Sequence, residues 1–465
     1  MSPDPDPPPS VPARLAPLLV GCVVLAALSL VIVPSTITFD PLTWATWARE
    51  IAHLRLDTRG GPAWKPLPVM VDVVFAPFGQ GEKWAWLVVA RAGALLAVAM
   101  AYRLARRLAG PIAGLIAAAG LALSSSYIEY LTPLGMSEPL MAGLFLLAIE
   151  RHLDGKYPHA YGLLFACLLL RPETFPFFVG YSVFMWLRFP RSRPWIVILL
   201  ALLPVLWLAP DYAGSGDWLR STKRAAVPSQ GGPLLTSFPA WAVVESAYNA
   251  VLLPIVVGAA VGVVLAVQEF RKQRRITTLA TFSLLGVGWI VEEALVTQAH
   301  FGSGDQRYLI VGYGLLCVLA GVGWVRLAAL VGGAPARVAA IAVIVAAAAP
   351  FVWQRADELT QTIGEIPYQA HKYGELETLI RQAGGRSRIL VCGPVTSDIY
   401  QMPAIAWDLD IHQHQVVIGV RPSGTVFRTR TVRGSPLLPP ELGSPDFHLV
   451  ARTGQWQLLR TCPNG

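Results

Sequence analysis

The chain has 465 residues, of which 54% are apolar and only 14% are charged, and its formal net charge is +8. Soluble proteins contain about 25% charged residues, so this composition excludes an ordinary soluble enzyme over most of the length and predicts an integral membrane protein. The 41 glycines and 38 prolines are spread through apolar segments, which also excludes a collagen-like or disordered chain.

Apolar segments long enough for membrane helices begin after a polar stub, residues 1–14. The first, Leu15–Val33, has no small-residue cleavage pattern, so we predict an uncleaved membrane helix rather than a signal peptide. Ten further apolar stretches bring the prediction to about eleven spans within a membrane domain of residues 15–354. They lie near Trp84–Leu104, Pro111–Tyr127, Pro139–Ile149, Tyr161–Leu170, Phe175–Leu187, Trp195–Ala209, Ala240–Val267, Thr278–Val296, Tyr308–Leu330 and Val338–Trp353.

Basic residues collect in alternate loops between these stretches, for example at Arg103–Arg107 and Arg271–Arg275. Because Lys and Arg concentrate in cytoplasmic loops, the alternation predicts a multi-pass protein of the plasma membrane with a cytoplasmic N-terminus. Topology therefore explains much of the positive charge, and no nucleic-acid partner is expected. The segments predicted on the outer side, including the first outer loop, residues 35–83, still hold basic residues that the rule leaves unexplained.

The C-terminal segment, residues 355–465, has a mixed polar composition, and an odd number of spans places it outside the cytoplasm. We predict a helix at Glu375–Arg381 and a small extracytoplasmic α/β or α+β domain. Its predicted strands are Arg388–Cys392, Gln415–Val420, Thr425–Val432, Phe447–Arg452 and Trp456–Thr461.

Two of the five cysteines, Cys392 and Cys462, lie in this predicted domain. An oxidising compartment could join them in a disulfide, and two buried thiols are the alternative, because spacing alone does not determine the Cα separation. The same segment alternates acidic and imidazole side chains at 408–414, but such residues on a strand or loop more often form an ordinary polar surface, so no metal site is predicted.

Charged side chains near membrane depth are costly and are therefore functional candidates. Asp40 follows the first span and precedes a proline. It is either a general base toward a hydroxyl or the N-cap of the next helix. Lys65, beside Trp64 in the rigid loop Gly60–Pro68, is either a point charge for a phosphate or an interfacial anchor.

Five further residues share this property. Glu138 begins an apolar helix, where an acidic residue also suits the positive end of the helix dipole. Arg171 and Glu173 lie at a predicted helix break, where they either bind a ligand or pair with each other. Lys223 belongs to a basic outer loop, and Arg307 enters the membrane from the outside, against the general charge bias.

Taken in order, these segments resemble the GT-C superfamily of membrane glycosyltransferases, which use polyprenyl-phosphate-linked sugars, especially its actinobacterial members. Asp40 occupies the position of the acidic residue that follows the first span in that family. Relatives often have an acidic pair there, whereas Pro41 follows in this chain, and Lys65 replaces a small polar residue. The other elements, spread over residues 35–330, are Trp64-Lys-Pro-Leu-Pro68, Gly135-Met-Ser-Glu138, Arg171-Pro-Glu173, Gly216-Asp-Trp-Leu-Arg-Ser-Thr-Lys-Arg224 and Arg307-Tyr-Leu309.

The resemblance implies a hexosyl- or pentosyltransferase in membrane lipid that moves a sugar from a polyprenyl-phosphate donor to a glycan, glycolipid or protein acceptor of the cell envelope. Asp40 would be the base. The donor phosphate and substrate would be bound by Lys65, Trp64, Glu138, Arg171, Glu173, Lys223 and Arg307. No cofactor is implied, while a divalent metal stays open. The chain has no Walker or Rossmann phosphate loop, which fits a donor activated elsewhere. A transporter and a non-catalytic envelope-assembly protein on the same scaffold are the alternatives.

Overall fold

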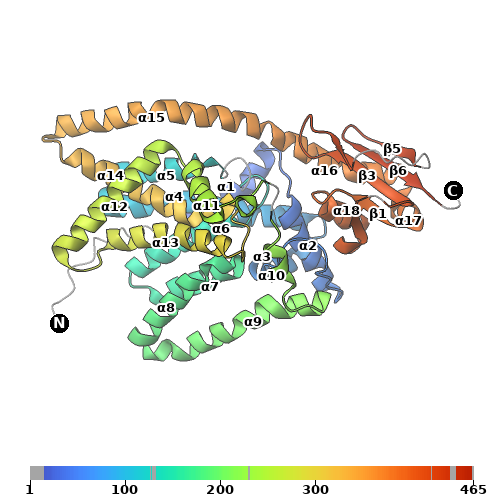
Figure 1. Cartoon of the computed structure of the whole chain (residues 1–465), viewed down its shortest axis with the longest axis horizontal. Coiled ribbons are helices and arrows are strands. Elements are labelled where there is room, and N and C mark those ends of the chain that lie inside the picture. The colour runs from blue at the N-terminus through green and yellow to red at the C-terminus, as the bar shows by residue number, and fades with distance from the viewer. Residues whose placement is uncertain are drawn as a thin grey trace.

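The computed structural model describes residues 15–125, 127, 132–228, 231–419, 421–439 and 447–462. An elongated body of helices occupies one end of the long axis, and a smaller part that contains a sheet occupies the other (Figure 1). The predicted polar stub, residues 1–14, lies outside the described residues.

The helices of the body begin where the sequence offers start signals, since many have proline in their first turn. They are α1 (Leu15–Ile32), α2 (Phe39–Ala52), α3 (Pro66–Phe75), α4 (Gly81–Ala109), α5 (Pro111–Ala122), α6 (Glu138–Leu153), α7 (Tyr157–Leu170), α8 (Phe175–Arg188), α9 (Arg193–Ser215), α10 (Arg220–Ala225), α11 (Pro239–Ala250), α12 (Leu253–Gln273), α13 (Thr278–Gln298), α14 (Ile310–Ala329) and α15 (Ala334–Ile363).

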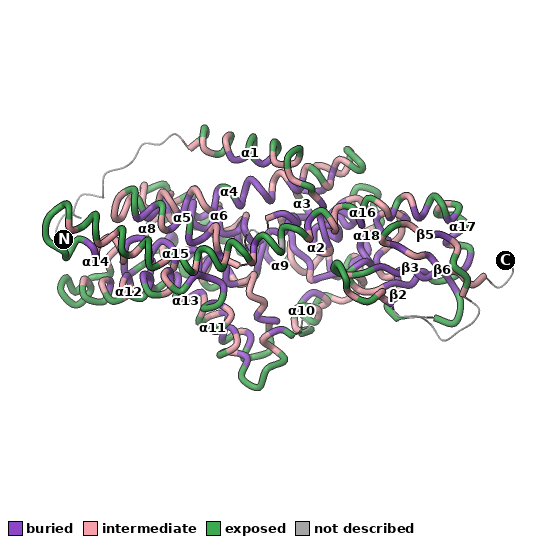
Figure 2. The backbone as a smooth tube through the Cα atoms, turned by 90° about the horizontal axis from the view of Figure 1, so that it is seen from above, coloured by how far each residue is buried: buried purple, intermediate pink, exposed green. Residues whose placement is uncertain are grey.

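Within the described residues, seven helical segments are long and apolar enough to cross a membrane. They are Leu15–Ile32, Gly81–Ala109, Pro190–Ser215, Leu253–Gln273, Thr278–Gln298, Gln306–Ala329 and Ala334–Gln382. Shorter apolar helices cover Pro66–Phe78, Pro111–Ala122 and Tyr157–Leu170, so the figure of about eleven spans stays a prediction. Exposed and half-buried residues dominate α1, which lies along one edge of the body (Figure 2), as expected for a helix that lipid covers.

One predicted span, Ala240–Val267, is interrupted. The helix α11 ends at Ala250, Val251 is extended, and α12 begins at Leu253 with Pro254 in its first turn. Pro254 has no N–H to donate to the carbonyl of Ala250, four residues earlier, and its ring would clash with that carbonyl, so a continuous helix across this point is disfavoured. Hydropathy alone misses such a break because the apolar character continues through it.

Glycines allow the central helix α14 to pack closely against its neighbours α5 and α12. A Cβ atom on Gly321 would lie 2.2 Å from the carbonyl oxygen of Ala113, and one on Gly323 would lie 2.1 Å from that of Gly258. Small residues are used at such contacts in membrane proteins because lipid gives helices no hydrophobic reason to associate.

The C-terminal sheet domain, residues 365–462, has a mixed sheet in the order β2-β1-β3-β6-β5, with β4 paired to β3. Strand β1 pairs in parallel with β2 and β3, and the other pairs are antiparallel. Four predicted strands and the predicted helix are present. The elements are α16 (Glu365–Gln382), α17 (Gly385–Val391), β1 (Val395–Ser397), α18 (Met402–Leu409), β2 (Val416–Ile418), β3 (Gly424–Arg430), β4 (Leu437–Leu438), β5 (His448–Arg452) and β6 (Trp456–Thr461).

The predicted strand Arg388–Cys392 is wrong, because these residues belong to or directly follow the helix α17. Gly384 and Gly385 have positive φ angles of 92° and 84°, and they turn the chain directly after α16. Ile389 is the buried residue of α17. A short apolar run does not distinguish one helical turn from a strand, and here the tertiary contact of Ile389 decides.

The sheet domain shares a hydrophobic core with the first outer loop. Trp44 and Trp47 of the loop and Trp86 of α4 belong to the same buried cluster as Phe427 and Trp456 of the sheet. The helix α2 lies between the body and α18, and ten of its 14 residues are buried. The first outer loop, which carries Asp40, is thus packed between the helical body and the sheet domain.

Polar contacts reinforce this junction. Arg55 on the loop bonds Asp410 at 2.6 Å, and His412 bonds Glu50 at 2.7 Å. Within the sheet domain, Cys392 and Cys462 form a disulfide with a Cα separation of 4.7 Å.

Candidate functional site

Asp40 and Glu138 both lie in the first turn of a helix, Asp40 in α2 and Glu138 in α6. Thr38, not Asp40, occupies the N-cap position of α2, so the capping alternative does not describe Asp40. Ser137 is the N-cap of α6 but makes no capping bond with its side chain. Both carboxylates therefore lie near the positive ends of helix dipoles and are free to contact other elements.

Three cations from three other elements converge on these carboxylates. Lys65 Nζ lies 3.1 Å from Glu138 Oε1 and 3.9 Å from Asp40 Oδ2. Arg171 Nη1 lies 2.9 Å from Glu138 Oε1, and Arg307 Nη1 lies 3.1 Å from Asp40 Oδ2. We call these five residues the charged cluster. Residues up to 267 positions apart in the chain meet in it.

The backbone explains why each cation can reach the cluster. Lys65 is the extended residue before α3, whose first residue is Pro66. Arg171 is extended at the break between α7 and a 3-10 turn, and Arg307 lies in a 3-10 turn that opens α14. Lys65, Arg171 and Arg307 thus all lie at helix ends, and their side chains extend into the interior of the protein rather than along a helix surface.

Burial of the cluster is almost complete. Glu138 is 0% exposed, whereas the side chain of Arg307 is 20% exposed and is the most accessible of the five. Burial lowers the pKa of the Lys65 ammonium, and the carboxylates of Glu138 and Asp40 oppose this shift. Glu173 holds Arg171 through two bonds of 2.6 and 3.1 Å. With Glu173 included, three cations face three carboxylates, which makes burial of so many charges tolerable.

The sequence analysis missed two aromatic residues in this site. The ring of Tyr308 lies 3.4 Å from Arg171 Cζ and 5.3 Å from Arg307 Cζ, measured to the ring centroid. The ring of Trp44 lies 4.9 Å from Lys65 Nζ. Aromatic faces attract cations and help to hold them in place. Both residues lie within the segments that prompted the choice of Asp40 and Arg307, so a search for aromatic neighbours would have found them.

A pair of acidic residues in α13, Glu292 and Glu293, was also missed. Glu293 is fully buried, and neither of its carboxylate oxygens has a hydrogen-bond partner among the described residues. Consecutive carboxylates inside the apolar stretch Thr278–Val296 are the same kind of signal that singled out the other candidates.

Glu173 adjoins the charged cluster through Arg171, whereas two other predicted residues lie outside it. The side chain of Lys223 is 68% exposed and bonds Asp217 at 2.6 Å. Trp64 is buried against Trp47, and its indole nitrogen donates a hydrogen bond to the carbonyl of Leu206 at 3.0 Å. Trp64 thus supports the loop next to Lys65, whereas Lys223 lines a separate cavity described below.

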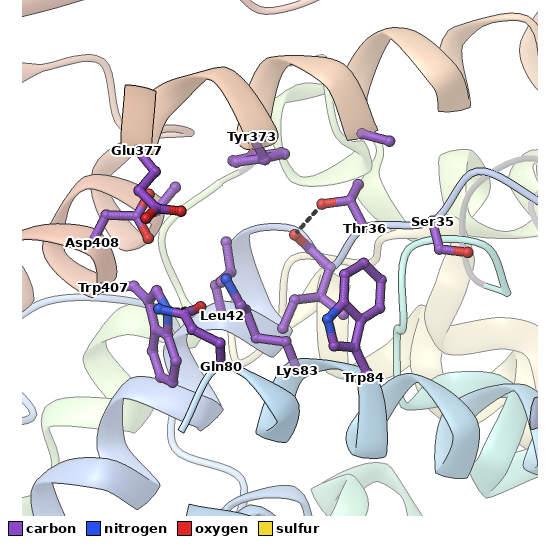
Figure 3. A pocket seen from close by; sticks show the side chains of 14 residues that line it. Ser35, Thr36, Leu42, Gln80, Lys83, Trp84, Tyr373, Glu377, Trp407 and Asp408 are labelled. Carbon is purple, nitrogen blue, oxygen red and sulfur yellow. Dashed lines mark hydrogen bonds between the residues drawn. The ribbon is translucent and has the colours of Figure 1, made fainter. Parts of the chain in front are cut away.

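Two cavities lie between the helical body and the sheet domain. The smaller, about 170 Å³, is bordered by α2, α4, α16 and α18. Figure 3 shows Glu377 and Asp408 side by side at one end of it, and the side chain of Lys83 extends from beside Trp84 toward this pair. The larger, about 650 Å³, is lined by the first outer loop, the loop around α10 and the sheet domain, and it includes Phe39, the residue before Asp40.

No group of three or more His, Cys, Asp or Glu side chains suited to a metal ion occurs in the part of the chain that the structure describes. The acidic and imidazole residues of 408–414 instead contact the first outer loop. His414 lies 3.1 Å from Asp57, and burial lowers the pKa of His414.

Comparisons with protein-family models and with curated proteins found no match. Among solved structures, ArnT from Cupriavidus metallidurans bound to undecaprenyl phosphate matches with a TM-score of 0.56 and 12% identity, over 97% of this chain and 98% of that one. The apo state of the same protein matches with a TM-score of 0.54 and 14% identity over the same shares. Across nearly its whole length, the chain therefore shares the fold of these ArnT structures, a mostly helical body with apolar helices and a small C-terminal sheet domain, as the sequence predicted.

Proposed function

We propose that this protein is a membrane glycosyltransferase that transfers a sugar from a polyprenyl-phosphate donor to an acceptor of the cell envelope. The observation that supports this most is the charged cluster, in which Asp40 and Glu138 meet three cations beside the sheet domain. The fold adds weight, since ArnT in the matched crystal structure binds undecaprenyl phosphate.

Lys65 and Arg307 are the proposed ligands of the donor phosphate. Each contacts Asp40, and Arg307 is the most exposed member of the cluster. Arg171 is held by both Glu138 and Glu173, so it contributes positive charge from a fixed position rather than by moving. Cations arranged before the reaction stabilise charge that develops on a leaving phosphate without a cost of reorganisation.

Asp40 is the proposed base. The acceptor hydroxyl would attack the anomeric carbon while its proton moves to a carboxylate oxygen of Asp40. The bond between the anomeric carbon and the phosphate oxygen breaks, and polyprenyl phosphate leaves with one more negative charge. Because Asp40 becomes neutral in the same step, Arg307 is released from its carboxylate partner as the phosphate gains charge. The total charge of the site stays constant.

The reaction is proposed to take place on the extracytoplasmic side of the plasma membrane, with the N-terminus in the cytoplasm. The alternation of basic loops supports this orientation. So does the disulfide between Cys392 and Cys462, since disulfides persist in oxidising compartments. The acceptor would be a glycan, a glycolipid or a protein.

The test uses membrane vesicles that contain the protein, supplied with radiolabelled polyprenyl-phosphate sugars and an envelope extract. Wild-type protein should label an envelope product. Asp40→Asn should lower the rate by about 10²- to 10⁴-fold while undecaprenyl phosphate still binds. Asp357→Asn on the exposed face of α15 is the matched control and should be fully active.

Full activity of Asp40→Asn would show that Asp40 is not the base. If the wild-type protein transfers no sugar from any donor but moves the lipid-linked sugar across the vesicle membrane, the protein is a transporter and the proposal is wrong.

A further inference from the structure

The larger of the two cavities has a strongly basic lining. It is formed by residues 59–61 of the first outer loop, by residues around α10 and by part of the sheet domain. The sheet domain contributes Ile399, Met402, His414, Val416, Val417, Ile418 and Arg421. Asp217 is its one acidic lining residue within the described parts of the chain. The cationic lining residues are Arg59, Arg220, Lys223, Arg224 and Arg421.

Three of these cations already have hydrogen-bond or ion-pair partners in the protein. Arg59 is bonded to Asp57, and Lys223 to Asp217 at 2.6 Å. Arg220 donates hydrogen bonds to the backbone carbonyls of Gly60 and Gly61 at 2.6 and 2.9 Å. These three residues therefore shape the wall of the cavity more than they attract a ligand.

Arg224 and Arg421 differ from the other three. The guanidinium group of neither residue makes a hydrogen bond or ion pair with any residue in the described part of the chain. They come from different elements that line the cavity, Arg224 from α10 and Arg421 from the segment between β2 and β3. A guanidinium has five donors in a planar fork that matches phosphate and carboxylate groups. Two unpaired guanidinium groups that line one cavity create a positive potential that an anion would neutralise.

The position of the cavity relates it to the proposed base. Phe39 lines the cavity, and Asp40 is the next residue in the first turn of α2. A volume of about 650 Å³ is within the usual range for ligand pockets of about 300–1,000 Å³. The smaller cavity differs in charge, because Glu377 and Asp408 line it together with Lys83. It offers no excess of positive charge.

We propose that the larger cavity binds the acceptor and that the acceptor carries an anionic group, a phosphate or a carboxylate, which Arg224 and Arg421 hold. This inference rests on the proposed glycosyl transfer. The anion would anchor the acceptor between the body and the sheet domain, and a hydroxyl group of the acceptor would reach Asp40 past Phe39. Arg224 and Arg421 thus select the acceptor by charge and take no part in the chemistry.

The experiment measures binding alone, in the absence of a sugar donor. Full-length protein in phosphatidylcholine nanodiscs is saturated with undecaprenyl phosphate and studied by saturation-transfer NMR. The probes are methyl glucoside, its 6-phosphate and methyl glucuronide, which differ in one charged group. An anionic probe should bind and the neutral one should not. Whichever anion binds more tightly identifies the acceptor group as a phosphate or a carboxylate.

Variants make the test specific. Arg224→Gln combined with Arg421→Gln should weaken binding of the anionic probe by at least about fivefold, given that exposed ion pairs contribute up to about 1 kcal/mol each. Arg452→Gln, on an exposed strand position outside the cavity, should bind like wild type. Equal binding of neutral and anionic probes, or unchanged binding in the double variant, would overturn the proposal.

Asp40→Asn separates this inference from the proposed function. It should bind the anionic probe like wild type although its rate of sugar transfer is strongly lowered. If the wild-type protein has no transferase activity but binds the probe through Arg224 and Arg421, the proposed function is refuted, and the cavity is an anion-binding site of another kind of protein. Transferase activity with no such dependence would refute only the acceptor site.

Discussion

Replacement of Glu138 by Gln tests whether the charged cluster depends on this buried carboxylate. Glu138 is fully buried, and its Oε1 accepts charged hydrogen bonds from Lys65 at 3.1 Å and Arg171 at 2.9 Å. Gln has nearly the same shape and keeps one carbonyl acceptor, but it carries no charge. In the variant, less negative charge would balance the positive charges of Lys65 and Arg171, in a site that water hardly reaches.

The expected cost follows from these contacts. A hydrogen bond that involves a charged group contributes about 1.5–3 kcal/mol, and removal of one partner from a buried ion pair costs about 3–5 kcal/mol. Because Gln keeps one acceptor and Arg171 keeps Glu173, we expect Glu138→Gln to lower the free energy of unfolding by about 3 kcal/mol. Lys65→Met should cost less, because Glu138 retains Arg171.

The two substitutions together form a double-mutant cycle. If Lys65 is destabilised by the loss of its partner, the combined variant should be more stable than the sum of the single effects predicts, by at least about 1 kcal/mol. The free energy of unfolding would be measured by SDS titration in dodecylmaltoside micelles. Glu269→Gln, which breaks the more exposed pair with Arg326, is the control and should cost less than about 1 kcal/mol. Additive effects of Glu138→Gln and Lys65→Met would refute the coupling.

Three further predictions concern other parts of the molecule. Arg307→Gln should weaken binding of undecaprenyl phosphate by about 10- to 100-fold through the loss of a charge-assisted bond, and unchanged affinity in a filter-binding assay would make Arg307 structural. Burial raises the pKa of Asp408 to about 6, so its ionisation destabilises the folded state as the pH rises from about 4 to 6, and the full penalty persists above pH 6. Asp408→Asn should therefore raise the thermal unfolding temperature at pH 7.5 and have little effect at pH 4; an equal shift at both values would contradict this. Cys462→Ser should destabilise the sheet domain by about 4 kcal/mol, since it opens a loop between positions 70 residues apart. An unchanged protease-resistance profile would show that the disulfide contributes little.

Much of the fold could be predicted because its signals are local. Runs of apolar residues indicate membrane helices wherever lipid, not another part of the protein, is the surrounding solvent. The strands β5 and β6 match their predicted segments to within a residue, since alternation in a half-buried strand is a property of neighbouring positions. The helix α17 was mistaken for a strand because its conformation depends on a distant contact of Ile389 rather than on its own pattern.

In the candidate site, too, some features could be predicted from local sequence and others could not. Sequence alone singled out Asp40, Arg171 and Arg307, since charged residues at helix ends within apolar sequence are costly and therefore conspicuous. It did not determine which charges share a site. Arg307 meets Asp40 across 267 positions, and Tyr308 places its ring against Arg171, while Lys223 faces a different cavity. Composition and local pattern thus determined that the chain crosses a membrane and where its unusual charges lie. Only the tertiary structure decided their partners, because the energy of an ion pair depends on a separation in space that chain distance does not specify.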